Sequence, residues 1–135
     1  MSSLRITSKP LFDRRWQGML SEYIISVAWS PDSILAASSA AGEVALWKDD
    51  SLTLLLSSSD RSQSIDCLAF SYDGQFLAAG GQDGKVRIWR SEEEIELIAT
   101  LENAPKWIDK LSWSPTSNLL AFSLGRYVQI WDAET

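Results

Sequence analysis

The stretch FLAAGGQDGKVRIW, residues 76–89, decides how this chain folds. A short apolar run leads into the turn GGQDG, and a run of alternating polar and apolar residues follows it and ends at Trp89. Asp-Gly between two such runs predicts a β-hairpin, because glycine readily adopts the positive φ of a tight turn. The same pattern ends at Trp47 upstream and at Trp131 downstream, so the three tryptophans are evenly spaced, 42 residues apart. The chain therefore consists of three copies of one unit.

Each unit divides into short strands separated by turn residues, which is typical of an all-β repeat. The turns SPDS, SYDG and SPTS begin at Ser30, Ser71 and Ser114. Their Pro and Asp residues favour tight turns. The expected strands span residues 24–29, 34–39, 43–47 and 52–56, then 65–70, 76–80, 85–89 and 95–101, then 108–113, 118–123 and 127–131. The third unit thus ends without a fourth strand. Residues 1–13 are expected to form a loose N-terminal arm, and residues 16–20 fit a further short strand.

Composition narrows the classes of function. The chain has 135 residues, of which 45% are hydrophobic and 22% charged, as in a soluble globular protein of one domain. A net charge of −6 argues against nucleic acid and anionic membranes as main partners. The absence of histidine excludes Ser-His-Asp and Cys-His catalysis and His-ligated metal sites. The sequence thus offers no catalytic constellation of these kinds, and we expect no cofactor.

The cellular location is predicted from what the sequence lacks. The single cysteine, Cys67, cannot form an internal disulfide, so nothing requires an oxidising compartment. The N-terminus lacks the apolar core of a signal peptide. No apolar run approaches the roughly 20 residues of a membrane span. A cytoplasmic protein is expected, with Cys67 as a packed thiol rather than a nucleophile.

The 42-residue period, the four strands per unit, the repeated turn and the closing tryptophan together resemble the WD-repeat β-propeller family. The resemblance covers about residues 14–135. It implies an all-β partial β-propeller of three WD-repeat-like four-stranded blades, approximately residues 22–57, 63–101 and 107–135, the last lacking its outer strand. It also implies a non-catalytic protein–protein interaction scaffold whose partners are other proteins. The alternatives are a regulatory or substrate-binding part of a larger enzyme or multi-domain protein, and a truncated propeller fragment.

The chain departs from the family pattern in its polar residues. The Trp-Asp ending is kept only at Trp131, and the Gly-His that precedes the first strand is missing from every unit. Asp83 matches the aspartate of the family's buried hydrogen-bond network, which is incomplete here. We therefore expect Trp47, Trp89 and Trp131 to be core residues and Asp83 to be structural, in blades held mainly by apolar packing.

The number of blades is small, because propellers usually have 4–8. Either the chain is a piece of a longer propeller, or two chains form a six-bladed ring as a homodimer. In the family an N-terminal strand completes the last blade. Residues 14–20 are therefore a candidate ring-closing strand, which between two chains would complete the partner's third blade.

The resemblance also implies a binding face, formed by the loops before the first strands and by the hairpin turns. Aromatic and arginine side chains are the usual hot spots of such interfaces, and Trp107 is the best single candidate. The alternative is that Trp107 and Tyr23 only cover the ends of their strands. The full candidate set is Trp107, Tyr23, Arg61, Gln63, Lys106, Gln82, Arg126 and Tyr127.

Overall fold

A computed structural model describes residues 12–59, 62–91 and 94–133 of the chain. In these ranges the predicted strands form, as three antiparallel sheets in which each strand pairs with the next along the chain. Blade 1 consists of β1 (Ile24–Trp29), β2 (Leu35–Ser39), β3 (Val44–Lys48) and β4 (Ser51–Leu56). Blade 2 consists of β5 (Ile65–Phe70), β6 (Phe76–Gly81), β7 (Lys85–Ser91) and β8 (Ile95–Glu102). Blade 3 consists of β9 (Leu111–Trp113), β10 (Leu119–Leu124) and β11 (Tyr127–Asp132).

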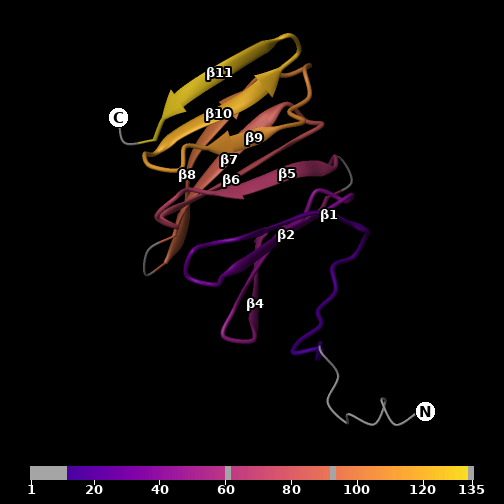
Figure 1. Cartoon of the computed structure of the whole chain (residues 1–135). Coiled ribbons are helices and arrows are strands. Elements are labelled where there is room, and N and C mark those ends of the chain that lie inside the picture. The colour runs from indigo at the N-terminus through magenta and orange to yellow at the C-terminus, as the bar shows by residue number, and fades with distance from the viewer. Residues whose placement is uncertain (1–11, 60–61, 92–93, 134–135) are drawn as a thin grey trace, which may run out of the picture.

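The three blades stack in chain order, with the N-terminal segment at one end of the stack and β11 at the other (Figure 1). The first strands contact one another, β1 with β5 and β5 with β9. The prediction of a partial β-propeller whose last blade lacks its fourth strand is confirmed for the described residues. No helix in this part of the chain is long and apolar enough to cross a membrane.

The first turn of every blade is closed by the same serine of the repeat. The backbone N–H of Ser30 donates to the Ile34 carbonyl at 2.9 Å, and Ser71 and Ser114 make the equivalent bonds at 2.8 Å. The three hydroxyl oxygens accept bonds from backbone N–H groups of the same turns. The repeated serine therefore supplies, by local hydrogen bonds, the reversal that each first hairpin needs.

Apolar side chains from facing sheets form two cores between the blades. The core between blades 1 and 2 contains Ile34, Ala36, Val44, Leu46, Ile65, Leu68, Leu77, Ala79 and Trp89. The core between blades 2 and 3 contains Cys67, Phe76, Ala78, Val86, Ile88, Ile108, Trp113, Leu120 and Phe122. Blade 2 is thus covered on both faces, whereas blades 1 and 3 each have a covered and an open face.

The closing tryptophans do not all lie in the core, and the expectation for Trp131 was wrong. Trp89 is 3% exposed, because β8 pairs beside it and blade 1 covers it. Trp131 is 45% exposed, since β11 has no fourth strand beside it among the described residues. Trp47 is buried in a different way, by the ring of Trp16, whose centroid lies 5.0 Å away at an interplanar angle of 65°.

Residues 12–20 form no strand in the single chain, contrary to the prediction for residues 16–20. Trp16 contacts Trp47, and Leu20 packs against the small cluster of Ala37, Ala45 and Trp47. The segment therefore lies on the open face of blade 1. A strand needs a neighbouring strand edge for its backbone hydrogen bonds, and the contacts of this segment are with a sheet face.

The first strand of blade 3 is shorter than predicted because Ile108 belongs to blade 2. Its backbone N–H donates to the Gly81 carbonyl at 2.9 Å, and its side chain is fully buried in the core between blades 2 and 3. The Lys110 carbonyl accepts the first backbone bond from the third sheet, from Ser123 N–H at 3.0 Å, and strand β9 begins at Leu111.

Glu43, in the turn between β2 and β3, fastens the chain that leads into blade 1. Its buried carboxylate oxygen Oε1 accepts hydrogen bonds from Ser21 N–H at 3.1 Å, Ser21 Oγ at 2.7 Å and Ser39 Oγ at 2.9 Å. Burial raises the pKa of this carboxyl, but the bonds from Ser21 and Ser39 outweigh it and hold the pKa below its ordinary value of 4.5. The folded state therefore favours ionised Glu43.

We expect Glu43→Gln to lower the free energy of unfolding at neutral pH by about 1.5–3 kcal/mol, the range for hydrogen bonds to a charged group. The lowered folded-state pKa means that this contribution is fully present above pH 4.5 and is lost as the pH falls through the folded-state pKa. Urea unfolding across this range should show the difference between wild type and variant shrinking in acid. Glu22→Gln, at an exposed neighbour, is the control. A difference that stays constant with pH would contradict the prediction.

Candidate functional site

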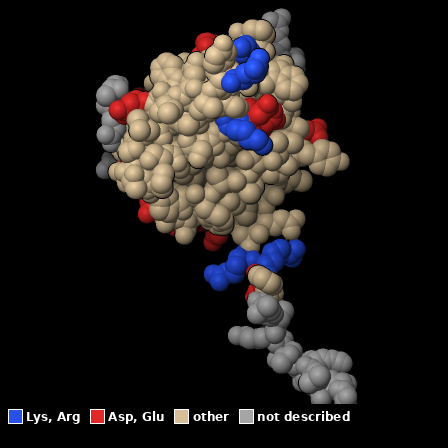
Figure 2. All heavy atoms as spheres, turned by 45° about the horizontal axis from the view of Figure 1, so that its top comes forward, with Lys and Arg blue, Asp and Glu red and all other residues tan. Residues whose placement is uncertain are grey.

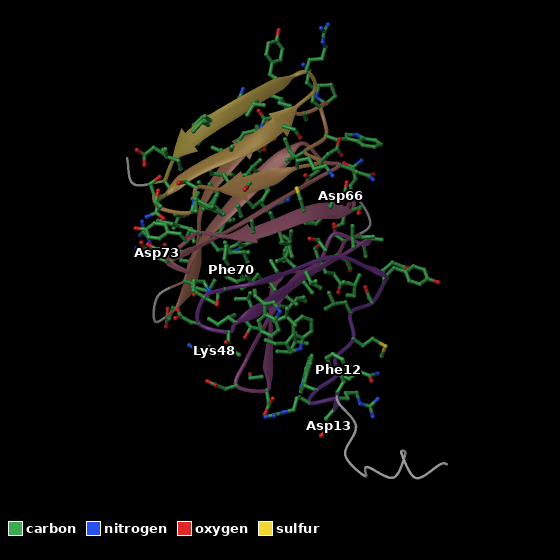
Figure 3. All side chains as sticks on the ribbon, viewed as in Figure 1. Phe12, Asp13, Lys48, Asp66, Phe70 and Asp73 are labelled. Carbon is green, nitrogen blue, oxygen red and sulfur yellow. The ribbon has the colours of Figure 1, made fainter. Side chains whose placement is uncertain are left out.

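The predicted binding residues that the structure describes lie at one edge of the blades. Asp66, near the start of β5, and Asp73, in the turn after β5, mark opposite edges of blade 2 (Figure 3). We call the Asp66 side the entry edge. It holds the segments that enter β1, β5 and β9 and the hairpin turns β2–β3, β6–β7 and β10–β11, since neighbouring strands are antiparallel.

The loop between β8 and β9 is fastened to the hairpin turn of blade 2. Asn103 N–H donates to the Gly84 carbonyl at 2.9 Å, and Lys106 N–H donates to the Asn103 carbonyl at 3.1 Å. At the end of the loop, Ile108 bonds to Gly81 as described above. The backbone around Trp107 is therefore held at both ends, which leaves the Trp107 side chain 54% exposed on a fixed support.

Three of the predicted residues meet where this loop faces the hairpin turn of blade 3. Lys106 Nζ lies 5.5 Å from the centroid of the Tyr127 ring, within the range of a cation–π contact. Lys106, Gly125, Arg126 and Tyr127 line a depression of about 470 Å³. We call Lys106, Trp107, Arg126 and Tyr127 the basic–aromatic cluster. Lys106, Arg126 and Tyr127 meet at this depression, and the exposed Trp107 is the neighbour of Lys106 in sequence, on a chain whose net charge is −6.

The remaining candidates do not join this cluster. Gln63 is exposed and lines a separate cleft of about 260 Å³ between blades 1 and 2. Tyr23 is exposed at the start of blade 1, and its carbonyl accepts a bond from Ala40 N–H. Gln82 is half-buried, and its backbone N–H donates a hydrogen bond to the Ser64 carbonyl. Arg61 lies outside the described residues. The predicted set is therefore divided among several places along the entry edge.

Arg87 is a residue of this edge that sequence reasoning missed. Its Nη2 lies 2.9 Å from Asp83 Oδ2, and both side chains are largely buried. Asp83 Oδ1 also accepts a bond from Lys85 N–H at 3.0 Å. Asp83 thus pairs with an arginine of its own hairpin. The signal was available in the repeat, because Arg87 stands where the other units have Ala45 and Gln129.

Cys67 is not placed for chemistry. Burial, together with the nearby Asp66 carboxylate, raises the pKa of its thiol to about 12. The thiol donates weak hydrogen bonds, at 3.5 Å, to the carbonyls of Gly80 and Ile108. A protonated buried thiol is a poor nucleophile. In the parts of the chain that the structure describes, no three acidic or cysteine side chains gather as metal ligands.

Comparison with known proteins adds sequence and structural relatives. The sequence model of the WD domain, G-beta repeat family matches residues 54–90 and 95–132. Periodic tryptophan protein 2 homolog of Dictyostelium discoideum is 33% identical over 85 residues, which is 62% of this chain and 9% of that protein. Apoptotic protease-activating factor 1 of Homo sapiens is 32% identical over 120 residues, which is 83% of this chain and 10% of that protein.

Solved structures share the fold. Chaetomium thermophilum Sqt1, bound to the N-terminus of the ribosomal protein L10, superposes with a TM-score of 0.70 at 19% identity, over 86% of this chain and 34% of that one. The chain spans about a tenth of the length of the two curated relatives and about a third of this structural neighbour.

Proposed function

Because this chain belongs to the WD domain, G-beta repeat family, we propose that it is a non-catalytic scaffold module that binds other proteins. The observation that carries the proposal is the basic–aromatic cluster, in which exposed Lys106, Arg126 and Tyr127 meet at one depression and the exposed Trp107 follows Lys106 on a hydrogen-bonded loop. Aromatic and arginine side chains contribute most to protein interfaces when they sit on a rigid frame. A solved neighbour with the same fold, Sqt1, is bound to a protein segment, which supports this class of function.

The chemistry of the cluster points to an acidic segment as its ligand. Lys106 and Arg126 offer two positive charges beside the depression, and Trp107 and Tyr127 offer apolar surface. A partner with alternating acidic and apolar side chains would match both. An acidic partner would also be repelled by the rest of a chain of net charge −6, which would confine binding to this cluster. A nucleic acid or an anionic membrane needs a broader basic face.

A second copy of the chain is a further proposed partner, because two copies would supply six blades, within the usual range of 4–8. A cytoplasmic location is part of the same proposal. It is supported by the single free cysteine, which is buried.

The ligand class can be tested by fluorescence anisotropy with a labelled peptide of alternating Glu and Leu, and with its counterpart in which Lys replaces Glu. The acidic peptide should bind and the basic one should not. Trp107→Ala and Lys106→Ala should each weaken binding about tenfold, which corresponds to about 1.4 kcal/mol. Lys48→Ala removes the same charge as Lys106→Ala, from blade 1 (Figure 3), and should leave binding unchanged. Equal affinity for the two peptides, or equal losses in Lys48→Ala and Lys106→Ala, would rule the cluster out.

A further inference from the structure

The two ends of the stack present apolar sheet faces that no other sheet of the described residues covers. On blade 1 the open face contains Val27, Trp29, Leu35, Leu52 and Leu54. On blade 3 it contains Leu119, Ala121, Val128 and Ile130. Figure 2 brings the blade 3 end of the stack forward, and most of the surface seen there is uncharged. Neighbouring exposed apolar side chains of this kind are typical of an interaction site.

The open face of blade 3 carries the repeat positions that face the following blade. Ile130 pairs with Ala121 on β10, as Ile88 pairs with Ala78 on β6. Ile88 is 5% exposed, because blade 3 covers it in the core between blades 2 and 3. Ile130 is 67% exposed. This face therefore has the residues of an interface between blades but lacks the next blade.

The open face of blade 1 carries the opposite positions, those that face the preceding blade. Trp29 pairs with Leu35, as Trp113 pairs with Leu120. Trp113 is 8% exposed, stacks on Phe76 of blade 2 at 5.7 Å and donates its Nε1–H to the Ala69 carbonyl at 2.9 Å. Trp29 is 66% exposed. It has the position and the ring to make these contacts, but no other blade of the described residues lies against it.

We propose that the two copies dock head to tail, with blade 3 of each chain covering blade 1 of the other. This docking rests on the association of two copies proposed above. In the repeat, Leu119 stands where blade 2 has Phe76, and Ser112 stands where blade 2 has Ala69. Trp29 would then pack on the partner's Leu119 and donate its Nε1–H to the carbonyl of the partner's Ser112. The two open faces are thus the two halves of the interface that the chain already forms twice within itself.

The arrangement of the two copies follows from this pairing. If two blade 1 faces met, both would offer the positions that face a preceding blade, and neither would offer those that face a following blade. A head-to-head dimer would therefore not reproduce the interface between blades. A head-to-tail contact used twice closes into a ring when the rotation per blade suits the blade number. Three blades from each of two chains give a ring of six, within the range of known propellers.

The N-terminal segment also fits this arrangement. Trp89 shares its core with Leu55, on the fourth strand of the preceding blade. The counterpart of Trp89 in blade 1 is Trp47. Beside Trp47, Trp16 and Leu20 take the place that Leu55 has near Trp89. In the ring, residues 14–20 would therefore lie beside the partner's third blade, where β11 has no fourth strand among the described residues. They would complete that sheet.

The test uses light scattering on the full chain, whose mass is 15.0 kDa. The wild type should have about twice this mass. Ile130→Asp and Trp29→Asp should each give the single-chain mass, because each charge enters both interfaces of the ring. An equimolar mixture of the two variants should regain a two-chain species. Blade 1 is intact in Ile130→Asp and blade 3 is intact in Trp29→Asp, so these two faces can still dock. Tyr72→Asp, at an exposed aromatic outside both faces, should leave the mass unchanged.

The outcomes separate the two proposals. Circular dichroism should show that both variants remain folded, since both substituted side chains are exposed. A wild-type dimer whose variants fail to complement each other keeps the second copy as a partner and overturns head-to-tail docking. A wild type that stays at the single-chain mass at all concentrations overturns both. Peptide binding to the basic–aromatic cluster is measured independently of either result.

Discussion

Trp89→Ala is expected to lower the free energy of unfolding by about 3–5 kcal/mol, the range for removing a buried large aromatic side chain. Trp89 is almost fully buried in the core between blades 1 and 2, against Leu46 and Leu77 among others. Its removal would leave a cavity between two sheets that are held together mainly by apolar contact. Because each blade of a repeat protein is stabilised by its neighbours, the loss should loosen blade 1 from blade 2.

Trp131→Ala is the matched control, since Trp131 occupies the same repeat position and is 45% exposed. In the Ile130→Asp background, in which the chain is expected to be single and Trp131 to stay exposed, we expect it to cost about 1 kcal/mol. Urea unfolding followed by tryptophan fluorescence and by circular dichroism would measure both variants. Equal losses at the two positions would show that burial against the neighbouring blade does not determine the role of the closing tryptophan.

Gly84→Ala is expected to cost about 2–5 kcal/mol. The residue has a φ of 75°, a conformation that costs a side-chain-bearing residue about 1–2 kcal/mol. An added Cβ would also lie 2.7 Å from Ala104 N and from the Lys106 carbonyl oxygen, so the loop backbone would have to move. Overpacking of this kind adds about 1–3 kcal/mol. Because this loop carries Trp107, the variant should also bind the acidic peptide more weakly.

Gly125→Ala separates the cost of the positive φ from the cost of the close contact between the added Cβ and the loop backbone. Gly125 has a φ of 61°, but the atom closest to an added Cβ is the flexible end of Lys106, at 3.4 Å. The expected cost is therefore about 1–2 kcal/mol, from the backbone conformation alone. Urea unfolding of the two variants side by side would measure the difference. A cost for Gly84→Ala no greater than that for Gly125→Ala would show that the loop is not held against the hairpin turn of blade 2.

Much of the candidate site was predictable from residues close together in sequence, and part of it was not. Lys106, Arg126 and Tyr127 were expected on one face, and the structure brings them together around one depression. Gln63 was expected with them but lies in the cleft between blades 1 and 2. The repeat predicts which edge a residue occupies. How far apart two residues of that edge lie depends on the angle between the blades, which no local pattern records.

The sequence by itself determined the three-unit plan. Alternating apolar residues, the serine turns at Ser30, Ser71 and Ser114, and the Asp-Gly hairpin of blade 2 all act through neighbouring residues, so strand order and blade number were predictable. Tertiary structure decided the rest. Ile108 left the third sheet because its backbone N–H donates to the Gly81 carbonyl of blade 2. Trp131 stayed exposed because no fourth strand lies beside it among the described residues. Such outcomes depend on which surface lies opposite a residue, and packing between distant segments determines that.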